Sequence, residues 1–194
     1  MPELMDNSGP YNPNRKFEDF SKEFLLKLLK AYMRAYMLLE AFWGTEVKNT
    51  GRFNEDEYVE LETKIWTRIA NTVQPMIAKL SNIELPVKDV VDAVKIGQIL
   101  PDNDINPDVF LSKIDIIDNN HAINTLVRCR TLEWLEEHTP ELIEPLCQRF
   151  EVAAMEAYGR ALNPDMTYRP LKLPPRQSRD EIPCQWEFKL EPKK

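Results

Sequence analysis

The sequence contains little glycine, with only five glycines among its 194 residues. Phosphate-binding loops need several glycines at fixed spacing so that the backbone can approach the phosphate closely. The nucleophile elbow of the α/β-hydrolases needs a glycine on each side of its serine. Neither pattern is present, so the sequence argues against a nucleotide-binding loop and against a serine hydrolase of that kind.

Basic residues are also few, since 25 Lys and Arg stand against 32 Asp and Glu, which gives a formal charge of −7. Nucleic acids and anionic membranes bind clustered Lys and Arg side chains. A membrane-spanning helix needs about 18 consecutive apolar residues. The longest apolar stretch is interrupted by the charged residues Lys27, Lys30, Arg34 and Glu40. We therefore expect neither a nucleic-acid partner nor a membrane partner.

Cysteine is scarce and widely spaced, at Cys129, Cys147 and Cys184. An odd number of distant cysteines does not predict a disulfide framework. The opening residues, Met1–Asn14, are polar and carry neither the basic nor the apolar region of a secretory signal. The sequence predicts a flexible arm over residues 1–18, reduced thiols and a cytoplasmic location.

Apolar residues make up 43% of the chain, which is enough for one hydrophobic core. We expect a single α+β domain over residues 19–194, with a helical half over residues 19–100. Ser21 can cap the first helix, in which apolar residues recur at spacings of three and four. This helix is predicted to end near Gly44.

A capping-box pattern, Asn54 followed by Glu57, predicts the start of a second long helix. Pro75 lies inside its apolar stripe and predicts a kink or break, because proline has no N–H to donate. A third helix is predicted over Val87–Ile96. The Pro-, Asp- and Asn-bearing run Leu100–Pro107 predicts a loop.

Residues 110–190 predict a small antiparallel sheet of about four strands with an inserted helix, in the order β-β-α-β-β. Two runs rich in β-branched residues, Leu111–Ile117 and Ala122–Cys129, flank turn-forming residues and predict a hairpin. Two more strands are predicted over Thr167–Leu173 and Ile182–Leu190. The helical half is expected to pack on this sheet.

The last strand shows the clearest period of two, and successive side chains of a strand point to opposite faces. Cys184, Trp186 and Phe188 are therefore predicted to point into the core. The alternate residues, Gln185, Glu187 and Lys189, are predicted to face solvent.

The three cysteines lie in segments that such a sheet can bring together. Cys129 ends the second strand, just before a helix that we expect Thr131 to cap, Cys147 lies in the inserted helix, and Cys184 lies in the last strand. The thiols can be small buried hydrophobes, which is the usual fate of free cysteine. They can also be ligands of zinc or iron. A third interpretation is a catalytic Cys129 or Cys147 with Glu144 as the carboxylate.

Other candidate site residues are few, because the chain has only two histidines. Glu144, His121 or His138 can complete a metal site, although both histidines also fit solvated surface positions. Arg128 next to Cys129 is a candidate anchor for a ligand carboxylate. His121, Trp134 and Trp186 are the other candidates for a small-molecule pocket.

The segments Val127–Thr131 and Ile182–Phe188, with Cys147 between them, resemble a set of largely uncharacterised bacterial proteins related to L-2-amino-thiazoline-4-carboxylic acid hydrolase. The order of elements also resembles the 4-vinyl reductase domain. The resemblance covers roughly residues 110–190. The related sensors often carry a further cysteine shortly before the last strand, where this chain has Leu173.

This resemblance implies a protein that binds a small molecule or a metal, and it implies a homodimer. The hydrolase relatives imply a rival function, the opening of a cyclic C–N bond, which requires an activated water or thiol and a cationic anchor. Cys129, Cys147 and Arg128 would serve in that reaction. A third hypothesis is a non-enzymatic adaptor subunit.

Overall fold

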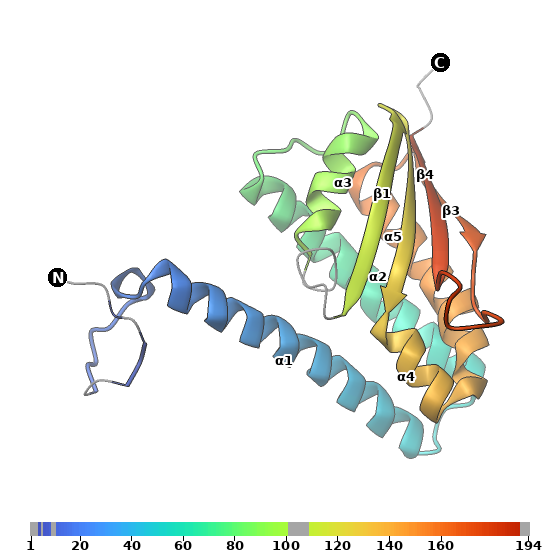
Figure 1. The fold of residues 1–194 in the computed structure, drawn as a ribbon, viewed down its shortest axis with the longest axis horizontal. Coiled ribbons are helices and arrows are strands. Elements are labelled where there is room, and N and C mark those ends of the chain that lie inside the picture. The colour runs from blue at the N-terminus through green and yellow to red at the C-terminus, as the bar shows by residue number, and fades with distance from the viewer. Residues whose placement is uncertain (1–3, 5, 9–10, 101–108, 191–194) are drawn as a thin grey trace. The chain divides into compact units, whose positions relative to one another are not determined.

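A computed structural model describes residues 4, 6–8, 11–100 and 109–190 of the chain (Figure 1). The chain divides into two compact units, an N-terminal unit of Met1–Glu46 and a C-terminal unit of Val47–Lys194. Of the predicted loop Leu100–Pro107, only Leu100 belongs to the described residues. The predicted arm over residues 1–18 is described only in part.

The N-terminal unit consists mainly of one long helix. A parallel bridge pairs Leu4 with Phe20, and helix α1 (Lys22–Asn49) begins just after Ser21 and continues into the first residues of the C-terminal unit. The Ser21 hydroxyl accepts a hydrogen bond from the Phe24 N–H at 3.2 Å, which is the expected cap. The predicted end near Gly44 is wrong, because a single glycine costs a helix only about 1 kcal/mol relative to alanine and does not stop it.

Helix α2 (Glu55–Leu80) opens the folded part of the C-terminal unit. The capping box is confirmed: the Asn54 side chain accepts from the Glu57 N–H, and the Glu57 carboxylate accepts from the Asn54 N–H, each at 2.9 Å. Of the predicted kink or break at Pro75, the break is wrong, since the helix runs through this residue, and the kink stays a prediction. Buried side chains on both sides of Pro75 hold the helix against the core, which outweighs one missing hydrogen bond.

Helix α3 (Val90–Gln98) begins three residues later than predicted, because Asp89 caps it by accepting the Asp92 N–H at 2.8 Å. Within the described residues no helix has the length and apolar character needed to cross a membrane.

A four-stranded antiparallel sheet follows, in the spatial order β1-β2-β4-β3. Its strands are β1 (Phe110–Asp118), β2 (His121–Cys129), β3 (Met166–Lys172) and β4 (Cys184–Leu190). The hairpin of β1 and β2 is confirmed, with Asn119 and Asn120 in its turn. The fold is α+β, with helices first in the chain and the sheet towards its end, as predicted.

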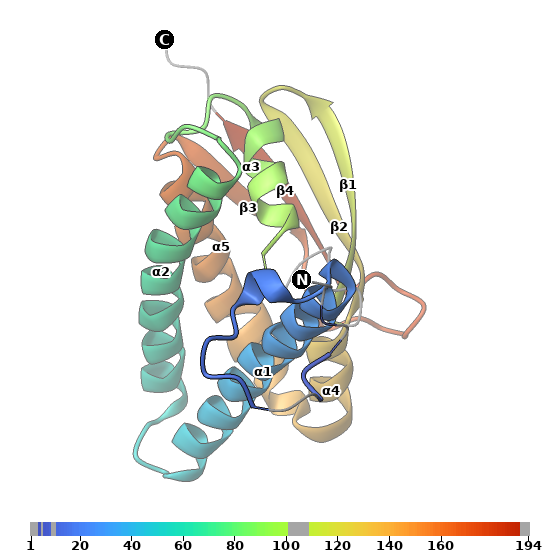
Figure 2. The same cartoon turned by 90° about the vertical axis from the view of Figure 1, so that its left-hand side faces the viewer.

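The segment that joins β2 to β3 is mostly helical. It comprises α4 (Arg130–His138), a 3-10 turn (Pro140–Leu142), a π-helical turn (Glu144–Phe150) and α5 (Glu151–Leu162). Figures 1 and 2 show α2, α3 and α5 on one side of the sheet, so we call the covered face the inner face.

The core of the C-terminal unit lies between these helices and the inner face. Its buried side chains include Ala78, Val90, Ile96, Ala122, Leu162, Cys184, Trp186 and Phe188. The predicted inward alternation of β4 is confirmed, with Trp186 only 2% exposed. The predicted exposure of Glu187 on the other face is wrong. Glu187 is buried because long side chains from the neighbouring strands lie over it.

Candidate functional site

Cys129 lies where β2 ends and α4 begins. Its Sγ accepts a hydrogen bond from the Leu132 N–H at 3.3 Å, so this thiol, and not Thr131, caps the helix. Burial raises the pKa of Cys129 to about 12, more than the hydrogen bonds to its sulfur lower it. Cys129 is therefore a protonated thiol at neutral pH.

The other two thiols are also desolvated. Cys147 lies in the π-helical turn, and burial raises its pKa above the ordinary value. Cys184 begins β4, and burial raises its pKa to about 12 although its Sγ accepts a hydrogen bond from the Trp186 indole N–H at 3.3 Å. Thiols in this state are weak nucleophiles, because the thiolate is the reactive form.

The three thiols belong to three separate elements and lie within electrostatic range of one another. Negative charge on Cys129 or Cys184 raises the pKa of Cys147, and negative charge on Cys129 raises the pKa of Cys184. The negative charge of Glu151 raises the pKa of all three thiols. We call Cys129, Cys147 and Cys184 the thiol cluster.

The carboxylates near the thiol cluster do not include Glu144, which the sequence suggested. Glu144 is exposed, whereas Glu151 and Glu136 are the carboxylates that act on Cys147. Glu151 follows Cys147 by four residues, a spacing that places both on one helical face. That spacing is a sequence signal that would have identified Glu151.

Zinc requires donor atoms at about 2.0–2.3 Å in a tetrahedral arrangement. Among the described residues, no three or more His, Cys, Asp or Glu side chains are grouped in a way that could hold a metal ion. Zinc or iron at the thiol cluster stays a prediction.

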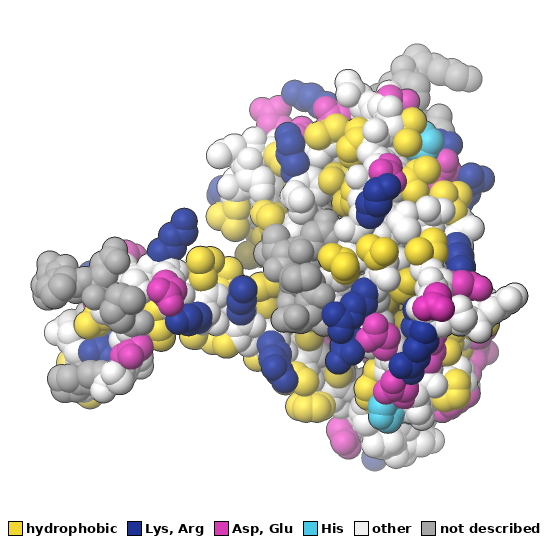
Figure 3. Space-filling view, viewed as in Figure 1, with side chains coloured by type: hydrophobic (Ala, Val, Ile, Leu, Met, Phe, Trp, Pro, Cys, Tyr) yellow, Lys and Arg dark blue, Asp and Glu magenta, His cyan; other side chains and the backbone are white. Residues whose placement is uncertain are grey.

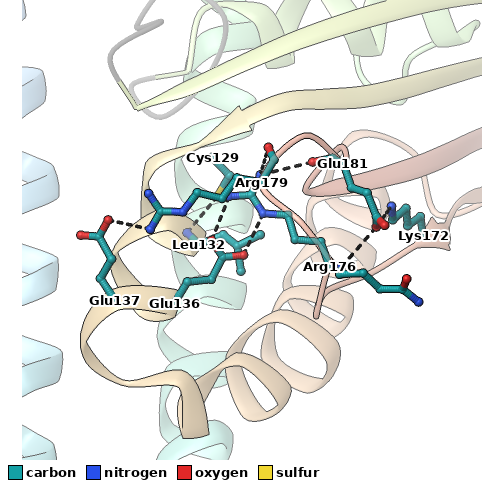
Figure 4. Close-up of polar contacts among 9 residues, drawn as sticks. Cys129, Leu132, Glu136, Glu137, Lys172, Arg176, Arg179 and Glu181 are labelled. Atoms are coloured by element: carbon teal, nitrogen blue, oxygen red, sulfur yellow. Dashed lines mark hydrogen bonds and ion pairs between the residues drawn. The ribbon is translucent and has the colours of Figure 1, made fainter.

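The loop between β3 and β4, residues 173–183, carries an arginine with a buried side chain, Arg176, near Cys129 (Figure 4). The Arg176 side chain is 6% exposed, and its Nε and Nη2 donate to the two carboxylate oxygens of Glu136 at 2.8 and 2.9 Å. Its Nη1 donates to the backbone carbonyls of Arg179 and Glu181. Cys129 lies within electrostatic range of this guanidinium group.

Further contacts tie the same loop to the helices and to β3. Arg179 pairs with Glu137 of α4 at 2.7 Å, and Lys172 pairs with Glu181 at 2.8 Å. The Gln148 amide, next in sequence to Cys147, donates to the Pro174 carbonyl at 2.7 Å. The loop is thus fastened beside the thiol cluster at several points.

Arg128, the cationic residue that the sequence suggested as a ligand anchor, is not buried as Arg176 is. Its side chain is exposed and lies 3.4 Å from Glu133, which Arg130 approaches more closely at 2.7 Å. No sequence pattern singles out Arg176, because its partner Glu136 lies 40 residues away.

The structure does not bring the two histidines to the thiol cluster. The His121 Nε2 lies 3.1 Å from Glu187 on the face of the sheet opposite the core. His138 is exposed and stacks on Trp134, whose own side chain is 48% exposed. Of the predicted aromatic candidates, Trp186 alone is buried next to a thiol.

The inner face carries polar atoms that have no hydrogen-bond partner among the described residues. Asn124 of β2 is 6% exposed, and its Oδ1 is buried without a partner. Asn124 pairs across the sheet with Trp186, and the adjacent pair is Leu126 with Cys184. Asn124 and Cys184 are therefore diagonal neighbours on one face.

Two more oxygens of this kind border the same core. The Ser112 Oγ of β1 is buried without a described partner, and Ser112 lies opposite Leu126, diagonal to Asn124. The Gln74 Oε1 of α2 is likewise unpaired, and Gln74 lies one turn before Ala78 of the core. We call Ser112, Asn124 and Gln74 the inner polar group.

Comparisons with known proteins found no matching family model, no matching curated protein and no matching solved structure. The resemblance to the thiazoline hydrolase relatives and to the 4-vinyl reductase domain stays a prediction.

The state of the thiols gives a direct prediction. We expect the folded protein to react with iodoacetamide near neutral pH roughly 1,000-fold more slowly than the urea-unfolded chain, because the pKa of Cys129 and Cys184 is raised from 9.0 to about 12. The rate for the folded protein should keep rising with pH beyond 9. Mass spectrometry of alkylated peptides measures each thiol separately, and fast labelling of Cys129 or Cys147 in the folded state would contradict the expectation.

Proposed function

We propose that this protein binds a small organic molecule against the inner face of the sheet, between the inner polar group and the thiol cluster. The observation that supports the proposal most strongly is the buried, unpaired Oδ1 of Asn124. Leaving a buried amide oxygen unpaired costs about 1–3 kcal/mol. A ligand N–H or O–H group that donates to Asn124 would remove this cost.

The surroundings of Asn124 favour an organic ligand with a polar edge and an apolar body. Ser112 supplies a second oxygen on the adjacent strand, while Trp186 and Leu126 supply apolar surface on either side. Ligand sites of this type are mostly apolar with a few placed polar groups. A neutral ligand fits better than an ion, because no charged side chain belongs to the inner polar group.

The raised pKa values of the thiols favour a role in ligand binding over a role in nucleophilic catalysis. A catalytic cysteine needs a lowered pKa or an adjacent base, whereas burial raises the pKa of all three thiols, and the nearby Glu151 raises it further. Cysteine in this state contributes a soft apolar surface to a ligand site.

Native mass spectrometry of freshly purified protein tests the proposal even though the ligand is unidentified. We expect part of the wild-type protein to carry an added mass of a few hundred daltons, within the size range of small-molecule ligands. Asn124→Leu should lose this mass, because leucine cannot accept the ligand's hydrogen bond.

Thr125→Val is the matched control, since Thr125 is the next residue of β2, faces away from the core and bonds to Gln185. This variant should keep the added mass. Once both proteins are freed of ligand, Asn124→Leu should unfold at no lower denaturant concentration than wild type, because the oxygen that it removes has no described partner. Equal bound mass in wild type and Asn124→Leu, or its absence from both, would refute the proposal.

A further inference from the structure

The two edges of the sheet differ in how well they resist pairing with another strand. Edge strands expose unpaired N–H and C=O groups, and proteins protect them with proline, bulges and charged side chains. Strand β3 has all three devices: Pro170 within the strand, an irregularity between Pro170 and Lys172, and the cations Arg169 and Lys172. This edge is protected.

The edge formed by β1 is less protected, although it carries Lys113 and irregularities near its two ends. It is nine residues long, contains no proline and pairs only with β2 in the described sheet. Its register is regular from Ser112 to Ile116, with irregularities only at the two ends. Three of its apolar side chains remain 44–56% exposed, namely Leu111, Ile116 and Ile117. A strand of this kind is suited to pair with another strand.

The charges of β1 match those of a second, antiparallel copy of the same strand. Lys113 and Asp115 lie on either side of Ile114 and point to the same face, with side chains 69% and 46% exposed. A two-fold axis through Ile114 places Lys113 of each copy opposite Asp115 of the other. Directly opposed residues of unlike charge stabilise an antiparallel pair.

We propose that two copies of this chain associate through β1, antiparallel and centred on Ile114, to form one continuous sheet of eight strands. The interface is isologous, as expected for a two-fold dimer. The interface then contains two ion pairs, each between Lys113 of one copy and Asp115 of the other. They replace the contact between Lys113 and Asp115 of the same strand, which is 2.9 Å in the single chain. This inference is independent of the proposed ligand.

Charge reversal on β1 tests the dimer by sedimentation velocity on the full chain. Wild type should be a dimer. Lys113→Glu places Glu opposite Asp twice, and Asp115→Lys places Lys opposite Lys twice, so each variant alone should dimerise with a dissociation constant roughly 30-fold higher or more. Mixing the two variants should restore a dimer of one copy of each, because every opposed pair then has unlike charges.

Lys88→Glu is the control for net charge, since Lys88 has an 80% exposed side chain outside the sheet. It should leave the dimer unchanged, and circular dichroism should show that all variants are folded. A monomeric wild type would overturn the proposal. Reversal variants that dimerise as tightly as wild type, or a mixture that stays monomeric, would overturn it as well and point to a different interface.

Discussion

Replacing Arg176 by alanine is expected to lower the free energy of unfolding by about 3 kcal/mol, measured by chemical denaturation. The guanidinium group is 6% exposed, and its partner Glu136 is also largely buried. Without Arg176, Glu136 would remain as a desolvated and unpaired carboxylate, and two backbone carbonyls of the β3–β4 loop would lose their donor. The loss of one partner of a buried pair is much more costly than the loss of a surface pair.

The control lies in the same loop. Arg179→Ala breaks the ion pair between Arg179 and Glu137, in which the two side chains are 63% and 51% exposed. It should lower the free energy of unfolding by less than about 1 kcal/mol. The hydrogen bond from Arg176 holds the pKa of Glu136 below its ordinary value of 4.5. The stabilisation is therefore present above pH 4.5 and is lost as the pH falls below it. Equal small losses for both arginine variants would show that the Arg176 pair does not fasten the loop.

Trp186→Ala is expected to destabilise the C-terminal unit by about 4 kcal/mol, because it removes the largest fully buried side chain and leaves a cavity. The indole packs within the core and also donates its N–H to the Cys184 sulfur. Thermal and chemical unfolding measure the loss. The variant should also make Cys184 more accessible to alkylation, since this thiol loses its cover.

Trp134→Ala is the matched substitution, because Trp134 is 48% exposed and stacks only on His138 at the surface of α4. Its expected cost is below about 1 kcal/mol. Both tryptophans are candidates for a ligand pocket on sequence grounds. Similar losses for the two variants would contradict the placement of Trp186 at the centre of the core.

Local patterns were sufficient to predict most of the fold. The period of two in β4, the capping box at Asn54 and the turn residues between β1 and β2 each depend on a few neighbouring residues, and the structure confirms all three. The errors occurred where tertiary contacts outweighed a local signal. Helix α2 continues through Pro75, and Glu187 is covered by Arg169 and Lys189.

The candidate site was harder to predict, because its parts are distant in sequence. The pairing of β2 with β4 puts the strands of Cys129 and Cys184 side by side, but the pairing of Arg176 with Glu136 depends on the path of a loop that has no periodic pattern. Asn124 was missed although a signal existed. The period of two in β2 places it on the same face as Ala122, so a polar residue on an inward-facing position was visible in the sequence.

The basic and acidic side chains on the face shown in Figure 3 are interspersed, without a large basic patch on that face. In the interior, Asn124 of the inner polar group and Cys184 of the thiol cluster are diagonal neighbours on the inner face of the sheet.

A crystal structure of the freshly purified protein tests most directly whether the sheet's inner surface holds a ligand. We expect electron density for an organic molecule that donates a hydrogen bond to the Asn124 Oδ1 and contacts Trp186. A single water molecule at this oxygen, or a rotated Asn124 amide that bonds to a protein group, would contradict the proposed binding site.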